Sequence, residues 1–110
     1  MPFPVTWPPE TGTSKMSRRI YVGGTTTLDF QDNAFMFAEL LGLSVPIAWP
    51  FQAIRVFNDG TADIEVTFDG TNIHGVVKPS RFSTWYDRTE SGIAVRSPGP
   101  GVTGYRIEGW

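Results

Sequence analysis

The chain has 110 residues, of which 40% are hydrophobic, 14% aromatic and 18% charged, and its formal net charge is −2. This length predicts one domain around one hydrophobic core, and the aromatic content excludes an intrinsically disordered chain. The absence of cysteine excludes disulfides, zinc–cysteine sites and thiol nucleophiles, and the slight excess of acidic residues argues against direct nucleic-acid binding. No run approaches the about 20 apolar residues of a membrane helix, and the N-terminus lacks the pattern of a secretion signal. We therefore expect a soluble domain with no membrane association.

Residues 1–17 are predicted to form an extended, proline-rich N-terminal arm. Prolines at positions 2, 4, 8 and 9 lack amide donors and push the residues before them out of the helical region. Phe3, Val5 and Trp7 lie at alternate positions in this arm, and a solvated tail has no need of such side chains. Two interpretations remain at this stage: the arm packs on its own domain, or these side chains insert into a neighbouring subunit.

Residues 18–110 are predicted to form a single domain, which begins with a hairpin. Strands at 19–22 and 25–30 flank Gly23-Gly24, a pair of residues typical of hairpin turns. Gln31–Leu43 is the one candidate helix, with Gly42 to end it. A buried strand is the alternative for this segment, because periodicity cannot separate the two in a short apolar run.

The next segment is predicted to connect to a second hairpin. Pro46 and Pro50 bracket an irregular connection that contains Trp49. A strand at 53–57 then meets Asn58-Asp59-Gly60, which is a strong hairpin signal. Residues 61–68 alternate polar and apolar at every position, which places positions 62, 64, 66 and 68 on the core face and positions 61, 63, 65 and 67 towards solvent.

Four turn regions and four further strands complete the pattern. The turns fall at residues 69–72, 78–80, 87–92 and 97–101, and the strands at 73–77, 81–86, 93–96 and 105–110. Six strands from Ala53 onward, with turn signals every eight to twelve residues, are typical of antiparallel all-β domains. The prediction is a mainly β, antiparallel sandwich, jelly-roll or immunoglobulin-like, with at most one short helix.

Catalytic interpretations find little support in the residue types present. His74 is the single histidine and is predicted to face outward from a strand, so it lacks the second ligand of common zinc sites. No serine lies in a nucleophile elbow, and no phosphate-binding glycine loop occurs. Asp63 and Glu65 share the predicted outward face of one strand, where paired carboxylates are usually a solvated face that discourages aggregation. We expect no enzyme activity, no cofactor and no metal site.

The tryptophans offer a second kind of chemistry. Trp49 lies in the irregular connection and Trp85 in a strand where we expect it to face outward with Arg81 and Ser83. An exposed Trp85 beside polar groups predicts a sugar-stacking surface, whereas core or subunit-interface packing is the alternative for both tryptophans.

From Ile54 to Trp110 the chain resembles small β-sandwich virion proteins of tailed bacteriophages, of the type that decorate capsids or complete the neck and tail. The resemblance rests on turns and strands: Asn58-Asp59-Gly60, Asp69-Gly70, Lys78-Pro79, Gly92-Ile93-Ala94-Val95-Arg96 and a last strand that ends in Trp110. It implies a structural protein located in the virion after synthesis in the host cytoplasm. Its implied partners are further copies of itself, as in a trimer, and the major capsid protein or other virion proteins.

The predicted function is therefore that of a non-enzymatic capsid decoration or cement protein, which stabilises the particle through oligomerisation and arm insertion. The candidate interface residues are Phe3, Val5, Trp7, Arg18, Arg19, Trp49 and Trp85. Lys15, Arg18 and Arg19 against Glu10 give the first twenty residues a net charge of +2, which favours an acidic neighbouring surface. The alternative function is a carbohydrate- or receptor-binding module of a phage fibre or tail.

Overall fold

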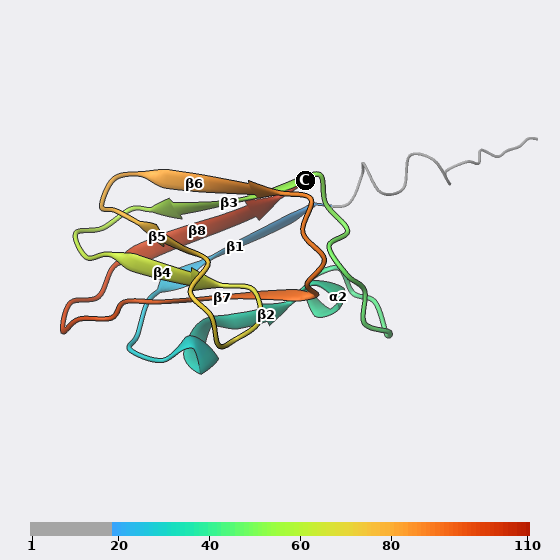
Figure 1. The fold of residues 1–110 in the computed structure, drawn as a ribbon, viewed down its shortest axis with the longest axis horizontal. Helices are drawn as coiled ribbons and strands as arrows, with labels where there is room; N and C mark the ends of the chain where they lie inside the picture. Colours follow the sequence, from blue (N-terminus) through green and yellow to red (C-terminus); the bar gives the residue numbers. More distant parts are fainter. Residues whose placement is uncertain (1–18) are drawn as a thin grey trace, which may run out of the picture.

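A computed structural model describes residues 19–110 as two four-stranded antiparallel sheets packed face to face (Figure 1). Sheet A has the order β1-β8-β3-β6 and sheet B the order β2-β7-β4-β5. The strands are β1 Ile20–Thr25, β2 Ala34–Met36, β3 Ala53–Asn58, β4 Ile64–Thr67, β5 Gly75–Val77, β6 Phe82–Tyr86, β7 Gly92–Arg96 and β8 Gly104–Gly109. The prediction of a mainly β, antiparallel sandwich is confirmed. The predicted arm, residues 1–17, lies outside the described residues.

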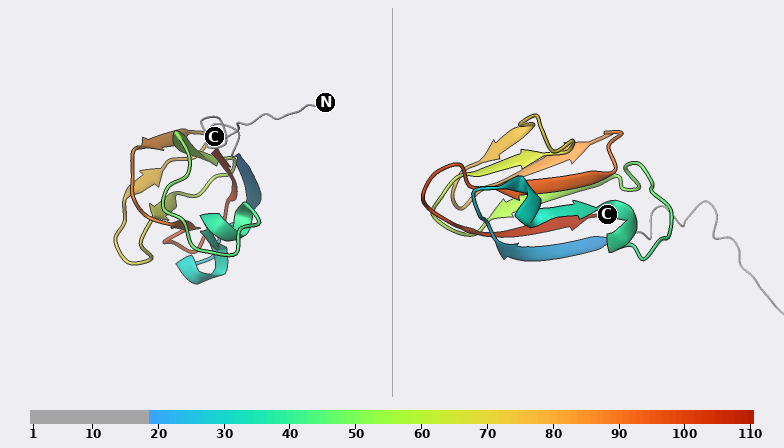
Figure 2. Two further views of the ribbon diagram at one scale, coloured as in Figure 1. Left: turned by 90° about the vertical axis from the view of Figure 1, so that its right-hand side faces the viewer. Right: turned by 90° about the horizontal axis from the view of Figure 1, so that it is seen from below.

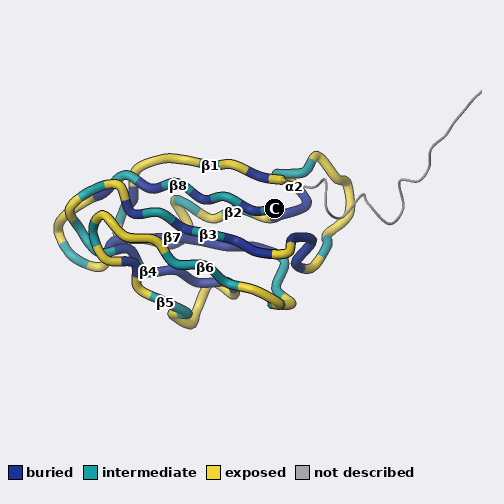
Figure 3. The backbone as a smooth tube through the Cα atoms, turned by 90° about the horizontal axis from the view of Figure 1, so that it is seen from above, coloured by how far each residue is buried: buried dark blue, intermediate teal, exposed yellow. Residues whose placement is uncertain are grey.

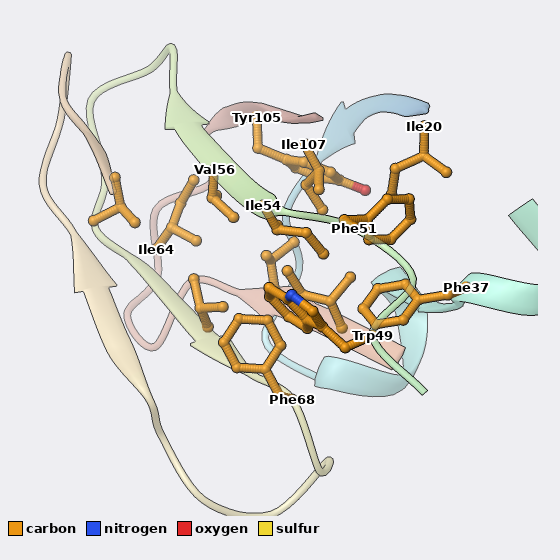
Figure 4. Packing of buried hydrophobic residues seen from close by; sticks show 14 residues of the cluster. Ile20, Phe37, Trp49, Phe51, Ile54, Val56, Ile64, Phe68, Tyr105 and Ile107 are labelled. Carbon is orange, nitrogen blue, oxygen red and sulfur yellow. The ribbon is translucent and has the colours of Figure 1, made fainter. Parts of the chain in front are cut away.

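The core lies between the two sheets and also takes side chains from the connection that closes one end of the sandwich (Figure 4). Alternate residues of β3, β4 and β8 point inward, and Ile54, Val56, Ile64, Val66 and Ile107 are all fully buried. At the closed end, the rings of Phe37, Trp49, Phe51 and Phe68 pack edge to face, with centroids 5.2–5.9 Å apart. Such pairs add stability beyond the buried area alone. One core therefore joins both layers, and Figure 2 shows the arrangement of the strands around it from the end of the molecule.

The predicted hairpin at Gly23-Gly24 is wrong. Both glycines lie inside β1, which pairs along its whole length with β8, the last strand of the chain. At Gly24 a Cβ atom would lie 2.9 Å from the Tyr105 hydroxyl, so glycine is required by the close approach of that side chain rather than by a turn.

The predicted helix at 31–43 is also largely wrong. The segment contains a 3₁₀ turn, η1 Phe30–Asn33, then the short strand β2, and then a single helical turn, α2 Phe37–Leu40. Gly42, with φ of 72°, does follow the end of this turn in the left-handed conformation that favours glycine. Phe30 and Phe37 are buried from different elements, which explains why the apolar pattern matched neither a helix nor a strand.

The third correction concerns Asn58-Asp59-Gly60. The strands on either side of it, β3 and β4, belong to different sheets, so this turn carries the chain from one layer to the other rather than forming a hairpin. Asn58 is buried, and its side-chain amide donates to the carbonyl oxygens of Ala62 at 2.6 Å and Val77 at 2.9 Å. The turn at 69–72 does join paired strands, β4 and β5, as predicted.

Thr67 was predicted to face solvent but is fully buried. Its hydroxyl lies beneath the following turn, where it donates to the Asp69 carboxylate at 3.0 Å and accepts from the Gly70 amide at 3.0 Å. Ile64, Val66 and Phe68 are buried as predicted.

Candidate interaction surface

The outer face of sheet A gathers most of the exposed aromatic side chains among residues 19–110. In the paired register, residues opposite each other point to the same face, so the outward positions of β1, β8, β3 and β6 can be read across the sheet. They carry Tyr21, Arg106, Glu108, Trp110, Arg55, Phe57, Phe82, Thr84 and Tyr86. We call this set the aromatic–arginine face; Figure 3 views sheet A from this side.

Arg55 lies at the centre of the aromatic–arginine face. Its guanidinium carbon is 4.7 Å from the ring centroid of Phe82 and 5.2 Å from that of Trp110. Its Nε donates to the Thr84 hydroxyl at 2.9 Å. A guanidinium that contacts aromatic rings and uses one of its five N–H donors within the sheet has further donors for contacts with a partner.

Arg106 covers the other side of the same cluster. Its guanidinium lies 4.1 Å from the Phe57 centroid and forms a two-pronged ion pair with Asp59, at 2.7 and 3.1 Å. The Arg106 hydrogen bond holds the pKa of the Asp59 carboxyl below its usual value. Phe57 and Phe82 face each other across β3 and β6 with centroids 5.5 Å apart, so the cationic and aromatic groups form one continuous cluster.

The aromatic side chains at the two margins are open to solvent. Tyr21 is 63%, Phe82 56% and Tyr86 60% exposed. Aromatic residues and arginine are the types enriched at protein interfaces, whereas a surface with no binding role rarely gathers them on one side. The face has a recess of about 340 Å³ beside β1, lined by Arg19, Ile20, Tyr21, Glu108, Gly109 and Trp110.

Of the three candidate interface residues that lie within residues 19–110, Arg19 alone lies on this face. Arg19 is exposed and lines the recess together with Tyr21 and Trp110. Trp49 is 6% exposed and packs in the core, with φ of 27°, so it presents almost no surface to a partner. Phe3, Val5, Trp7 and Arg18 lie outside the described residues.

The expectation that Trp85 faces outward with Ser83 is wrong. Trp85 points inward opposite Ile54, packs against the core and meets the Phe68 ring edge to face at 5.4 Å. Its ring also fills the space where a Cβ on Gly75 would stand, 2.6 Å away. The neighbouring residues Thr84 and Tyr86 face outward instead, so the exposed aromatic position on this strand is displaced by one residue.

The other polar residues singled out in the sequence have local structural partners. Nδ1 of His74 accepts the Phe68 amide at 3.0 Å and its side chain is 18% exposed, so the expected outward orientation is wrong. The reason is that β5 begins only at Gly75, which leaves His74 in the turn. Asp63 pairs with Lys78 at 2.9 Å and Glu65 with Arg96 at 2.8 Å, which ties each carboxylate to a different neighbour.

A second concave feature lies on the opposite layer. This cleft of about 600 Å³ is lined by β2, β7, the end of β4 and the loops at 46–48 and 89–91. Both of its carboxylates are engaged, Asp69 within its own turn and Glu90 with Arg88 at 2.8 Å. Among residues 19–110, no group of three or more histidine, aspartate or glutamate side chains is arranged to hold a metal ion. Nor does this part of the chain contain a helix long and apolar enough to cross a membrane.

Comparisons with known proteins add little to this description. No protein-family profile matches the chain, and no curated protein matches it in sequence. A solved structure described as the crystal structure of FeII HppE is similar, with a TM-score of 0.47 and 12% identity. The similarity covers 84% of this chain and 43% of that one, so this chain spans less than half of that protein's length. At this score and identity it carries no statement about function.

Proposed function

We propose that the protein is a non-enzymatic structural protein of a tailed bacteriophage particle, of the capsid decoration or cement type, and that it assembles through the aromatic–arginine face. The observation that carries the proposal is the arrangement on sheet A: exposed Tyr21, Phe82 and Tyr86 surround an arginine stacked among aromatic rings. The strand-and-turn resemblance to small virion sandwiches supports the assignment to a phage particle.

The chemistry of the face fits attachment better than turnover of a substrate. Arg55 and Arg106 already contact aromatic rings, so part of the cost of ordering these side chains is met before a partner binds. Well-packed arginine and aromatic side chains at the centre of an interface are the usual sources of binding energy. Burial of this face between copies, or against the capsid surface, would cover aromatic area that is now in contact with water.

The experiment replaces Phe82 and Tyr86 by serine in one variant. We expect the variant to unfold at nearly the wild-type urea concentration but to show a lower native mass in analytical ultracentrifugation and at least tenfold weaker binding to particles that lack the protein. The matched control replaces Leu28 and Val45 by serine in the same way. These side chains are 61% and 62% exposed and lie in loops outside the face. Equal losses of native mass and of particle binding in the two variants, or no loss in either, would contradict the proposal.

A second function is favoured by one observation on the same face. Tyr86 is exposed on the strand that also carries the outward hydroxyl of Thr84, which is the combination that a sugar-stacking surface requires. Under this alternative the Tyr86→Ala variant loses glycan binding while its native mass is unchanged. Loss of native mass without any glycan binding in the wild type favours assembly.

A further inference from the structure

The β6 edge of sheet A exposes a defined set of backbone groups. Among the strands of residues 19–110, β6 is the last of its sheet and pairs with β3 alone. The Asn58 amide donates to the Arg81 carbonyl at 2.8 Å, and the same register then places Val56 opposite Ser83 and Ile54 opposite Trp85. Because hydrogen-bonded positions alternate along an antiparallel pair, residues 81, 83 and 85 direct their backbone groups towards β3. Those of Phe82, Thr84 and Tyr86 therefore point to the free edge.

These three residues also carry the outward side chains of β6. In an antiparallel pair, hydrogen-bonded residues lie directly opposite each other and place their side chains on the same face. An antiparallel strand added at this edge therefore presents its pairing residues on the aromatic–arginine face, next to Phe82, Thr84 and Tyr86. The edge thus fixes which face the apolar residues of an incoming strand must occupy.

Residues 2–7 have the sequence of a strand that can pair along one side only. Pro2 and Pro4 have no amide donor, whereas Phe3, Val5 and Trp7 keep theirs. In an extended chain, successive residues direct their backbone groups to opposite sides, so all three of these donors share one side and the prolines lie on the other. The pairing side is therefore the side of the three apolar residues.

We propose that residues 2–7 of one copy add as an antiparallel strand to the β6 edge of sheet A in a second copy, with Val5 opposite Thr84. Phe3 then lies opposite Tyr86 and Trp7 opposite Phe82, where cross-strand aromatic pairs form. Val5 is the central pairing residue of the arm and Thr84 the central residue of the edge. The proposal rests on the assembly function above and names the contact through which assembly occurs.

The assembly proposed above makes a second copy the partner of the arm, and the position and length of the arm permit this contact. The described chain starts at Arg19 and enters β1, which is the opposite edge of sheet A from β6 (Figure 3). Copies placed edge to edge bring the start of the arm next to the β6 strand of the neighbour. Residues 8–18 span up to about 35 Å when extended, which is enough to join the two edges. Such head-to-tail contacts form a ring, as in a trimer, when the rotation between copies closes, and an open filament when it does not.

A disulfide between separately purified variants tests this contact. The chain has no cysteine, so the Val5→Cys protein mixed with the Thr84→Cys protein contains only the two introduced thiols. Opposed residues at a hydrogen-bonded position have Cα atoms about 5.5 Å apart, which lies within the range that a disulfide bridges. We expect a mixed disulfide dimer, distinguished by a size tag on one variant, in at least fivefold greater yield than when Ser83→Cys replaces Thr84→Cys.

Equal yields with the Thr84 and Ser83 variants would overturn strand addition at this edge. A chain carrying both Val5→Cys and Thr84→Cys that forms only an internal disulfide, with no mixed dimer between copies, would overturn the placement in a second copy. Proline substitutions give an independent readout: Val5→Pro removes a pairing donor and is expected to lower the native mass, whereas Thr6→Pro removes a donor on the opposite side and leaves it unchanged.

These outcomes are separate from those of the proposed function. An oligomer that forms without the mixed disulfide contradicts strand addition and leaves the assembly proposal standing. A mixed disulfide in a protein that binds no particle contradicts the virion assignment and supports the contact between copies.

Discussion

A single buried amide, that of Asn58, holds together three segments of the sandwich. Besides its two donated bonds, its side-chain oxygen accepts from the Thr103 hydroxyl at 2.7 Å and from the Gly60 amide at 3.1 Å. All of the strong hydrogen-bonding positions of the amide are thus used in a site that is 1% exposed. Buried polar side chains of this kind are stabilising only while every partner is present.

We predict that Asn58→Ala lowers the free energy of unfolding by about 2–4 kcal/mol, because it removes four buried or partly buried hydrogen bonds, to Ala62, Val77, Thr103 and Gly60. Urea denaturation followed by tryptophan fluorescence measures the change. The control Asn72→Ala, at an exposed turn position, is expected to cost less than about 1 kcal/mol. A smaller loss at Asn58 than at Asn72 would show that the buried network contributes little.

Asn58 also explains why the hairpin predicted at Asn58-Asp59-Gly60 is wrong. Asn-Asp-Gly is a common hairpin turn because its residues tolerate left-handed backbone angles and hydrogen-bond to their own backbone. Here the asparagine side chain turns into the core instead and binds residues from β5 and from the loop before β8. No local pattern distinguishes these two uses, since the deciding partner, Thr103, is 45 residues away in the chain.

At the scale of elements, the β4–β5 hairpin is organised by the carboxylate of Asp69. It accepts the amides of Thr71 and Asn72, each at 2.8 Å, the Asn72 side-chain amide at 2.7 Å and the Thr67 hydroxyl at 3.0 Å. The Asn72 and Thr71 amides, the largest contributors, lower the pKa of this carboxyl far below its usual value. The negative charge therefore contributes stability above the ordinary carboxyl pKa near 4 and loses it as pH falls through the lowered pKa.

We predict that Asp69→Asn has a lower thermal midpoint than the wild type at pH 7. The difference between the two midpoints (the gap) is expected to narrow steadily between pH 4 and pH 2. The reason is that the Asp69 carboxylate of the unfolded wild type takes up a proton as the pH falls below its ordinary pKa, which favours unfolding, whereas asparagine takes up none. Thermal unfolding of both proteins across this pH range measures the gap. A gap that is the same at pH 7 and pH 2 would mean that the carboxylate charge does not stabilise the turn.

The six strands from β3 to β8 were predicted close to their observed ranges, because turn residues mark their ends. Alternation also identified the core face of β4, except at the buried Thr67. The segment from Phe30 to Leu40 was predicted poorly because three short elements follow each other within it. On β6 both faces carry aromatic residues, so alternation alone did not decide whether Trp85 or Tyr86 points inward.

At the scale of the whole molecule, the sequence could not predict which of the two sheets each strand joins. Alternation shows which side of a strand is buried but not which strand lies beside it, and β1 and β8 pair across most of the described chain. The aromatic–arginine face exists only because β1, β8, β3 and β6 lie in this order. For the same reason the sequence pointed to Trp49 and Trp85 but missed Tyr21, Arg55, Phe82 and Tyr86.

In the proposed assembly, copies of this chain join through the arm and the aromatic–arginine face. Sedimentation equilibrium of the full chain and of a variant that lacks residues 1–17 measures this assembly. We predict a mass that is a multiple of 12.2 kDa for the full chain and a fall towards the single-chain mass for the shortened variant. Cooperative unfolding should be retained, since the core lies within residues 20–107. A full chain of single-copy mass, or the same oligomer with and without the arm, would contradict assembly through the arm.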